Sequence, residues 1–285
     1  MKDRIVLITG ASSGIGLETA KQLAAQGAQL VLVARSEDKL KEAVATIKAQ
    51  TPSANVKYYI ADFSSQKSVR NLAQNITRNY TKLDVLINNA GCVVPEFQLT
   101  EDGLEKTIAT NHFAYFILTN ELLPLVKKSD YARIVNVASG SHYQGKIDFE
   151  SFTKEKGYFI MKAYAQSKLA NVLFTYELAE RLKGTQVTVN CLHPGFVKTE
   201  IGNKKTNWYS SFFWSLGTML GGISVQNGAK TSVYLASSPE VKGVSGKYFD
   251  KCKAVEPNKD AYNADLRKQL WQVSENFAGS AVVSQ

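Results

Sequence analysis

Short apolar segments alternate with longer segments of helical periodicity along most of the chain. The apolar segments consist mainly of β-branched residues and leucine without polar alternation, which is typical of parallel strands buried on both faces. Seven strands are expected, at residues 5–8, 30–34, 56–61, 83–88, 133–138, 187–192 and 247–250. The segments between them predict helices at residues 18–26, 37–50, 101–126, 162–183 and 224–235, and one more that begins after Ser64 or Ser65.

Strands that alternate with helices predict a doubly wound α/β fold of the Rossmann type, in which helices cover both faces of a seven-stranded, mostly parallel sheet. The length of 285 residues admits one domain or two. No linker, repeat or break in composition divides the chain. We therefore expect one domain over residues 1–285.

Composition excludes several classes of protein. Hydrophobic residues make up 44% and charged residues 21%, which is ordinary for a globular domain and argues against disorder. The cysteines and histidines are few and widely spaced: Cys92, Cys191, Cys252, His112, His142 and His193. Their spacing argues against a disulfide framework and a metal site, and it favours a reducing compartment.

The formal net charge of +9 favours acidic partners such as nucleic acid, an anionic membrane or a phosphate-rich cofactor. The basic residues are scattered and match no nucleic-acid-binding motif, so we expect no nucleic acid as a partner. The apolar run at residues 5–8 is too short for a signal peptide, and no run approaches the ~20 residues of a membrane span. These features predict a cytoplasmic protein and leave peripheral membrane contact open.

A glycine-rich turn lies between the first expected strand and the first expected helix. Glycines at a strand–helix turn let the backbone approach a pyrophosphate, which the N–H groups and dipole of the helix then bind. The spacing here is GxxxGxG, and a turn that merely packs helix on strand is the alternative interpretation. The residues expected to bind a dinucleotide there are Gly10, Ser12, Ser13, Gly14, Ile15 and Gly16.

The end of the second strand indicates which dinucleotide would bind. An acidic residue at that point would bind the ribose 2′-hydroxyl of NAD. Here Ala34 ends the strand and Arg35 follows it. A guanidinium suits a 2′-phosphate, so NADP(H) is favoured over NAD(H), although an ordinary surface arginine is the alternative.

Tyr164 and Lys168 lie four residues apart in an expected helix, so they share one face. A phenol titrates near ~10, and lowering that pKa to ~7 takes about 4 kcal/mol. An ammonium about 4 Å away, at an effective dielectric constant of ~20, supplies about 4 kcal/mol. The pair is therefore an adequate acid–base unit, although many helices carry Tyr and Lys at this spacing without such a role.

The glycine turn and the Tyr/Lys pair belong to a longer series of motifs along the chain. In sequence order the series is Thr9–Gly16, Asn88–Gly91 after the fourth strand, Asn111, Ser139 at the end of the fifth strand, Tyr164 with Lys168, and Pro194–Gly195. In this order they resemble the short-chain dehydrogenase/reductase family over essentially the whole chain. Two stretches are similar to its retinol dehydrogenase-like branch: Tyr164–Glu180 and His193–Glu200.

The interval from Ser139 to Tyr164 also suits that branch. One departure is the N-terminal membrane anchor that retinol dehydrogenases often carry, which we do not expect here. Protochlorophyllide reductase shares the fold and the Tyr/Lys pair of this family but usually has additional inserted sequence.

The resemblance implies four catalytic residues. Ser139 would hydrogen-bond the substrate oxygen, and Tyr164 would donate or accept the proton. Lys168 would bind the nicotinamide ribose and hold the pKa of Tyr164 down, while Asn111 would position a water in the proton relay. Hydride would pass directly between nicotinamide and the carbinol carbon, with no metal.

The resemblance also implies a set of cofactor contacts. Tyr164 and Lys168 belong to it as well as to the catalytic set. Beyond the glycine turn and Arg35, the others are Asp62 and Phe63 at the adenine, Asn89, Ala90 and Gly91 along the cofactor, and Pro194, Gly195, Val197 and Thr199 around the nicotinamide.

Three other residues near these motifs have plainer explanations. Cys92 follows the glycine of Asn88–Gly91, and a buried inert thiol is expected there rather than a nucleophile. His142 would either meet a substrate or play a structural part. His193 is expected to shape its turn, because Tyr164 already supplies acid–base chemistry.

The leading hypothesis is an NADP(H)-dependent oxidoreductase that interconverts a lipophilic, retinal-like aldehyde or ketone and its alcohol. A reductase of another hydrophobic substrate, such as a tetrapyrrole, is one alternative. A non-catalytic NADP-sensing protein is another, because fold does not fix function. The sequence leaves a homodimer open and identifies neither the substrate nor the physiological direction.

The segment 206–229 contains no charged residue and follows the Pro194–Gly195 turn.

 The run ends at Ala229, so that Lys230 is the next charged residue along the chain. Its apolar residues recur at helical spacing: Trp208, Phe212, Leu216, Met219 and Leu220, with Phe213 and Trp214 beyond the stripe. A core helix is one interpretation. The other is a substrate lid at about residues 200–224 whose aromatic outer side rests on a membrane surface.

Overall fold

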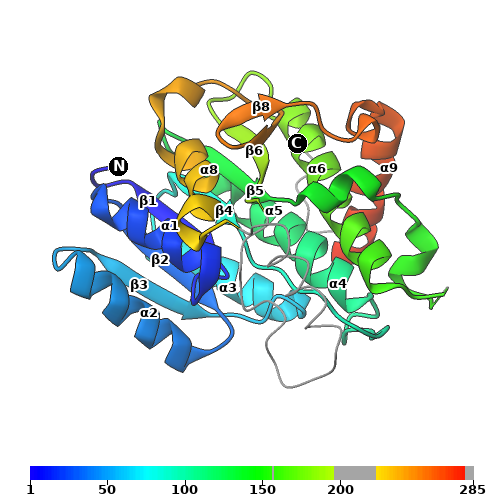
Figure 1. Ribbon diagram of the computed structural model, residues 1–285, viewed down its shortest axis with the longest axis horizontal. Coiled ribbons are helices and arrows are strands. Elements are labelled where there is room, and N and C mark those ends of the chain that lie inside the picture. Colours follow the sequence, from blue (N-terminus) through cyan, green and yellow to red (C-terminus); the bar gives the residue numbers. More distant parts are fainter. Residues whose placement is uncertain (156, 196–222, 280–285) are drawn as a thin grey trace.

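The computed structural model describes residues 1–155, 157–195 and 223–279. Eight strands form one sheet in the order β3-β2-β1-β4-β5-β6-β7-β8 (Figure 1). Their bounds are β1 Ile5–Thr9, β2 Gln29–Ala34, β3 Val56–Ile60, β4 Val85–Asn88, β5 Arg133–Val137, β6 Thr188–His193, β7 Lys247–Asp250 and β8 Lys253–Val255. All neighbours pair in parallel except β7 and β8. The predicted α/β class is confirmed, while the strand count of seven was one too low.

Helices pack on both faces of this sheet. The longer ones are α1 Gly14–Ala25, α2 Glu37–Gln50, α3 Gln66–Asn79, α5 Ala114–Val126, α6 Ile160–Arg181, α8 Val225–Ser237 and α9 Ala264–Ala278. The short ones are α4 Lys106–Ile108, the π-helical segment η1 Ala109–Phe113, and the 3₁₀ segments η2 Gly140–Gln144, η3 Phe149–Phe152, η5 Pro239–Val241 and η6 Lys259–Tyr262. No helix in the described part of the chain is long and apolar enough to cross a membrane.

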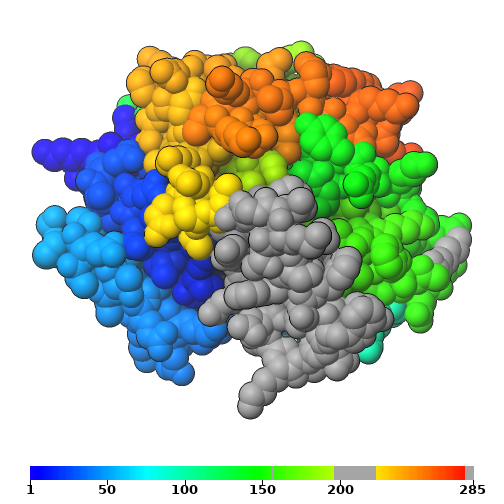
Figure 2. Space-filling model, viewed as in Figure 1, coloured from blue at the N-terminus to red at the C-terminus, as the bar shows by residue number. Residues whose placement is uncertain are grey.

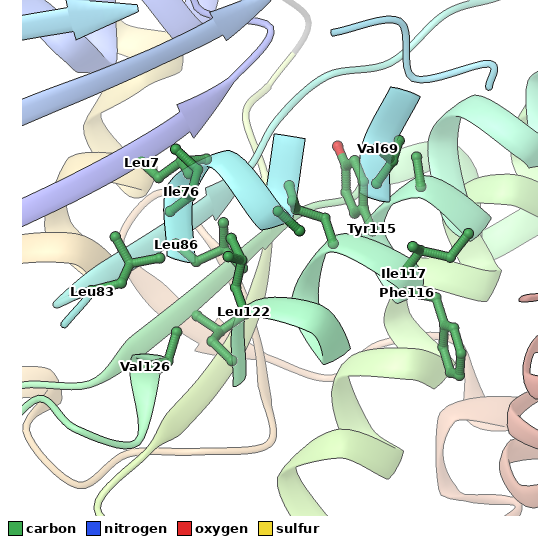
Figure 3. Close-up of a cluster of buried hydrophobic side chains, with 14 of the residues drawn as sticks. Leu7, Val69, Ile76, Leu83, Leu86, Tyr115, Phe116, Ile117, Leu122 and Val126 are labelled. Carbon is green, nitrogen blue, oxygen red and sulfur yellow. The ribbon is translucent and has the colours of Figure 1, made fainter. Parts of the chain in front are cut away.

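Alternating side chains of the strands supply two separate cores. Val6 and Ile8 of β1 pack with α1, α2 and α8, whereas Leu7 faces α3, α5 and α6. Figure 3 shows part of the second core, where Leu7 and Leu86 of the sheet lie near Ile76 of α3. Because both faces are covered, the strands need apolar residues at every position, which explains their continuous apolar sequences.

The helices on the first face lie against each other as well as against the sheet. The Gln22 side-chain amide of α1 hydrogen-bonds the Gln226 carbonyl of α8 at 3.4 Å. Figure 2 shows the blue surface of α1 next to the yellow start of α8. This pairing fixes the helix that follows the glycine turn.

Two helix starts differ from the sequence-based predictions. The first helix begins at Gly14 instead of residue 18, directly after the glycine turn. The helix predicted from residue 101 begins at Lys106, because the Glu105 carboxylate accepts hydrogen bonds from the N–H groups of Thr107 and Ile108. It then passes through η1 before α5.

The order of the strands in the sheet reverses its direction at β1, which pairs with β2 on one side and β4 on the other. In an open parallel sheet, ligands bind at the carboxyl ends of the strands near such a reversal. The glycine turn, Asn88–Gly91 and Ser139 all lie at that edge. The predicted lid at 200–224 lies almost entirely outside the described residues, as do Val197 and Thr199.

Candidate active site

The end of β1 is joined to the end of β4 by the buried hydroxyl of Thr9. This oxygen accepts hydrogen bonds from the N–H groups of Asn89 at 2.8 Å and Ala90 at 2.9 Å. The Asn89 side-chain amide donates in turn to the Thr9 carbonyl at 2.8 Å. The two segments predicted to lie along a cofactor are therefore fixed to each other.

Two glycines of the turn are required by this close approach. A Cβ at Gly16 would lie 2.4 Å from the Gly10 carbonyl oxygen and 2.6 Å from the Asn89 amide nitrogen. A Cβ at Gly10 would lie 2.8 Å from the Cα of Ala90, and Gly10 also has φ +65°. At these two positions glycine is needed for packing, as the alternative interpretation of the turn proposed. The close packing brings Asn89 and Ala90 beside the start of α1.

The amino terminus of α1 lacks a side-chain cap. Ser13 is at the N-cap position in an extended conformation, and its side chain accepts no hydrogen bond from the helix. No acidic residue lies in the first turn of this helix. Four of the other longer helices begin with a side-chain cap, from Ser36, Ser65, Ser224 and Asn263. The N–H groups of Gly14, Ile15 and Gly16, with the Ser12–Ser13 turn before them, therefore leave the positive end of α1 for an anion.

The end of β2 carries an exposed guanidinium. Ala34 is buried, whereas Arg35 is exposed and makes no hydrogen bond or ion pair with another described residue. The nearby Glu37 carboxylate is 3.1 Å from the Lys41 ammonium and accepts a hydrogen bond from Tyr58. The closest acidic side chain in sequence is therefore paired elsewhere.

The end of β3 offers the second carboxylate oxygen of Asp62 and the backbone of Phe63 for contacts with a ligand. Asp62 uses one carboxylate oxygen to accept hydrogen bonds from the N–H and hydroxyl of Ser64, at 2.9 and 2.8 Å. The Phe63 ring is buried in the core formed with α3 and α5. Only the backbone of Phe63 is left to meet an adenine ring.

Ser139 and Tyr164 come together from β5 and α6. Both side chains are half-buried. Burial raises the pKa of the Tyr164 phenol above 10, and a hydrogen bond with the Ser139 side chain lowers it by less. The phenol therefore holds its proton at neutral pH.

The Lys168 ammonium lies one helical turn from that phenol. It is buried, donates a hydrogen bond to the Val137 carbonyl at 3.1 Å, and lies 5.7 Å from the centre of the Tyr164 ring. Burial lowers the pKa of Lys168 to about 8, and no carboxylate of a described residue pairs with it. An ammonium has three donors, so two remain for a ligand.

The expected lowering of the Tyr164 pKa by Lys168 is not found in this structure. The ammonium lies over the ring and bonds the Val137 carbonyl instead of the phenol oxygen. Removal of the phenol from water then outweighs the effect of the distant charge. The arrangement suits a proton donor, as carbonyl reduction requires.

Asn111 lies in η1, and π-helical segments occur frequently at functional sites. Its amide nitrogen donates to the Cys92 carbonyl at 3.0 Å and to the Ser167 hydroxyl at 2.9 Å. Its amide oxygen accepts from the Cys92 N–H at 2.7 Å. Both donors of the side chain are thus used to hold Cys92 against α6, which leaves one lone pair of the amide oxygen for the water predicted here.

The loop after β4 passes close to these groups. A Cβ at Gly91 would lie 3.2 Å from the Asn111 amide oxygen and 3.6 Å from the Lys168 ammonium. Burial raises the pKa of the neighbouring Cys92 thiol, which stays neutral. This agrees with the expectation of an inert thiol.

Sequence reasoning missed three side chains that position this edge of the sheet. The hydroxyl of Thr9 is described above, and that of Tyr115 donates to the Ala90 carbonyl at 2.7 Å. Tyr158 donates to the Val94 carbonyl at 2.7 Å and so ties the loop after β4 to the segment before α6. A hydroxyl that bonds backbone far away in sequence leaves no periodic signal.

Pro194 and Gly195 follow β6 at the same edge, and Gly195 has φ +85°. The structure thus brings Ser139, Tyr164, Lys168, Asn111 and Gly91 together. Apart from Val197 and Thr199, which lie outside the described residues, the other predicted cofactor residues lie along the carboxyl ends of the neighbouring strands and at the start of α1.

Comparison with known proteins agrees with this geometry. The family model for short chain dehydrogenases matches residues 4–210. The chain belongs to the short-chain dehydrogenase family and is therefore an oxidoreductase. Within that family its similarity is to the retinol dehydrogenase-like branch.

Mouse retinol dehydrogenase 13 is 39% identical over 98% of this chain and 85% of its own length. Human retinol dehydrogenase 14 is 40% identical over 98% of this chain and 87% of its own. Among solved structures, an uncharacterized protein from Mycobacterium paratuberculosis has a TM-score of 0.77 at 32% identity, and covers 97% of this chain and 94% of its own. A short chain dehydrogenase from Shigella flexneri, complexed with NADP, has a TM-score of 0.69 at 28% identity, and covers 89% of this chain and 98% of its own.

Proposed function

We propose that the protein is an NADP(H)-dependent oxidoreductase that interconverts a lipophilic, retinal-like aldehyde or ketone and its alcohol. The observation that carries the proposal is the set formed by Ser139, Tyr164 and Lys168, in which a protonated phenol is hydrogen-bonded with the Ser139 side chain and a buried ammonium lies 5.7 Å from the centre of its ring. A phenol that keeps its proton is suited to protonate the oxygen of a carbonyl during reduction.

The residues at the carboxyl edge of the sheet fit a nicotinamide dinucleotide. The uncapped start of α1 suits the pyrophosphate. Lys168 has two unused donors for the ribose hydroxyls next to the nicotinamide, and the absence of a Cβ at Gly91 leaves space beside it. When bound, the nicotinamide supplies or accepts the hydride.

Arg35 supports NADP(H) as the form of the cofactor, since its guanidinium is exposed and unpaired among the described residues. The Shigella flexneri relative with bound NADP, and an Escherichia coli relative of 28% identity complexed with NADPH, support the same choice. We assign Asp62 and the backbone of Phe63 to the adenine end. We assign Asn89 and Ala90 to the middle of the cofactor, and Pro194 and Gly195 to the nicotinamide end.

The side chains of the site have separate roles in the reaction. Ser139 donates a hydrogen bond to the substrate oxygen, and Tyr164 gives that oxygen its proton. Lys168 holds the ribose and keeps a positive charge beside the phenol, which stabilises the phenolate left behind. Asn111 holds the Cys92 segment against α6 and offers its remaining lone pair to a water that returns a proton. The similarity to retinol dehydrogenases supports a lipophilic substrate.

Replacement of the Tyr164 hydroxyl tests the proposal. Tyr164→Phe removes only the proton donor, so kcat for reduction of retinal or a long-chain aldehyde by NADPH should fall by ~100-fold or more, with NADPH affinity nearly unchanged. Tyr176→Phe is a control on the same helix, because Tyr176 packs its ring on Tyr262 and is not among the predicted site residues. Substantial kcat in Tyr164→Phe, or equal losses in both variants, would overturn the assignment.

A further inference from the structure

Two histidines hold the two sides of the peptide group that joins Ser139 to Gly140. On one side, the Ser139 carbonyl accepts a hydrogen bond from Nδ1 of His142 at 2.7 Å. On the other, the Gly140 N–H donates to Nδ1 of His193 at 3.0 Å. The orientation of this peptide sets the direction in which the Ser139 side chain leaves the end of β5.

His193 reaches Gly140 from the end of β6, the strand beside β5. Its ring lies against the glycine, because a Cβ at Gly140 would be 3.3 to 3.6 Å from three of its ring atoms. A nitrogen that accepts a hydrogen bond carries no proton, so the ring is neutral with its hydrogen on Nε2.

His142 holds the other side from a buried position. Its Nδ1 donates to the Ser139 carbonyl, and its Nε2 accepts from the N–H of Asn258 at 3.1 Å. The ring packs on Tyr143 and Tyr248, with ring centres 4.0 and 4.5 Å apart. Both ring nitrogens therefore have defined partners, and the structural interpretation of this histidine holds.

Burial keeps the two rings neutral, and the charged groups around them have smaller effects. Burial lowers the pKa of His142 to about 4; the hydrogen bond with the Ser139 carbonyl opposes this shift, and the neighbouring His193 adds to it by less. Burial also lowers the pKa of His193 below 6.5, against a smaller opposing effect of Asp250, while Lys251 lowers it. Asp250 pairs with His193 in register on β7, and Lys251 follows it.

The hydroxyl of Ser139 depends on the same peptide. It accepts a hydrogen bond from the Ser141 N–H and bonds the Ser141 hydroxyl, both at 3.2 Å, and it also meets Tyr164. A protonated His193 would turn an N–H toward the Gly140 N–H in place of an acceptor. The two donors would repel, and the peptide would have to rotate.

We propose that neutral His193 is a positioning residue that, together with His142, fixes the Ser139–Gly140 peptide so that the Ser139 hydroxyl meets the substrate oxygen, and that protonation of His193 at acid pH releases this hydroxyl. This inference rests on the proposed function, in which Ser139 binds the substrate oxygen. It assigns a positioning role in catalysis to a ring that accepts a hydrogen bond from the Gly140 N–H.

Two substitutions of His193 separate its acceptor from its bulk. His193→Asn places an amide oxygen near the position of Nδ1 and cannot become protonated, whereas His193→Leu has no acceptor. At neutral pH, kcat for reduction of a long-chain aldehyde should fall by ~10- to 100-fold in the Leu variant and by less than ~3-fold in the Asn variant, because small misplacements of a catalytic group are costly. The Kd for NADPH should be unchanged in both variants.

The pH profile provides the second readout. Below the pKa of His193, kcat/KM of the unsubstituted protein should decline as pH falls, since the acceptor is lost. The Asn variant should keep its kcat/KM through that range until His142 titrates near pH 4. If the Leu variant does not fold, this comparison alone decides the matter. An unchanged acid decline in the Asn variant would overturn the proposal.

A double variant links the effect to Ser139. In a Ser139→Ala background, His193→Leu should cause no further loss of kcat, because its effect acts through the missing hydroxyl. An additional loss as large as in the single variant would contradict the positioning role. If Ser139→Ala alone keeps full activity, the proposed catalytic set fails; if Ser139→Ala is inactive while His193→Leu is fully active, only the role of His193 fails.

Discussion

Replacement of Arg35 by Ala removes the guanidinium that we expect to distinguish NADPH from NADH.

 The guanidinium is exposed at the end of β2, and no described residue neutralises it, because Glu37 is paired with Lys41. The variant therefore loses a charge and its hydrogen-bond donors without breaking a described ion pair. We expect the fold to be unaffected.

The size of the effect follows from the exposure of the side chain. A hydrogen bond to a charged group contributes about 1.5–3 kcal/mol, which corresponds to ~10- to 150-fold in affinity. Solvent and salt weaken an exposed pair, so the lower part of that range applies. Arg35→Ala should raise the Kd for NADPH by ~10- to 30-fold and leave the Kd for NADH within about twofold.

Titration of both cofactors by the quenching of protein fluorescence measures the two Kd values at low and at physiological salt. Arg78→Ala is a suitable control, because Arg78 is exposed in the last turn of α3, away from the carboxyl edge of the sheet. The difference between cofactors should shrink as salt is raised. Equal losses for NADPH and NADH would show that Arg35 does not contact the 2′-phosphate.

Two further predictions concern the lysine and the glycine turn. Since burial lowers the pKa of Lys168 to about 8, kcat/KM for NADPH should decline as pH rises through about 8 and the ammonium loses its charge. Lys168→Arg should remove that decline. A profile that stays flat up to about pH 9.5 in the unsubstituted protein would contradict the assignment. Gly16→Ala should lower the free energy of unfolding by ~1–3 kcal/mol, because its Cβ would lie 2.4 Å from the Gly10 carbonyl. Urea unfolding measures the loss, and an unchanged midpoint would refute the packing argument.

The sheet was largely predictable because buried parallel strands have continuous apolar sequences. β8 was missed, since it contains only Lys253–Val255, is exposed, and follows a tight turn at Lys251 and Cys252 that contains no glycine. α9 was missed as well, although Trp271 packs on Phe116 at 4.9 Å between ring centres. Its sequence is mostly polar, and only a few residues face the core.

The residues of the candidate site that belong to a sequence motif could be predicted, whereas the features that depend on backbone contacts in the fold could not. The spacing of Tyr164 and Lys168 places them on one face of a helix, as found. The direction of the Tyr164 pKa could not be read from that spacing, because it depends on burial and on the Val137 carbonyl that binds the ammonium. Likewise, the contact of His193 with Gly140 depends on the neighbouring positions of β5 and β6, which sequence order alone does not reveal.

Transfer of deuterium from the cofactor tests the central claim most directly. The protein would be incubated with NADPH deuterated at the nicotinamide C4 position and retinal or a long-chain aldehyde, and the alcohol would be analysed by mass spectrometry. Direct hydride transfer predicts an alcohol with deuterium on the carbinol carbon and a solvent-derived proton on its oxygen, and Tyr164→Phe should yield almost none. An alcohol whose carbinol hydrogen comes from solvent, or no alcohol from any lipophilic aldehyde or ketone tried, would contradict the account.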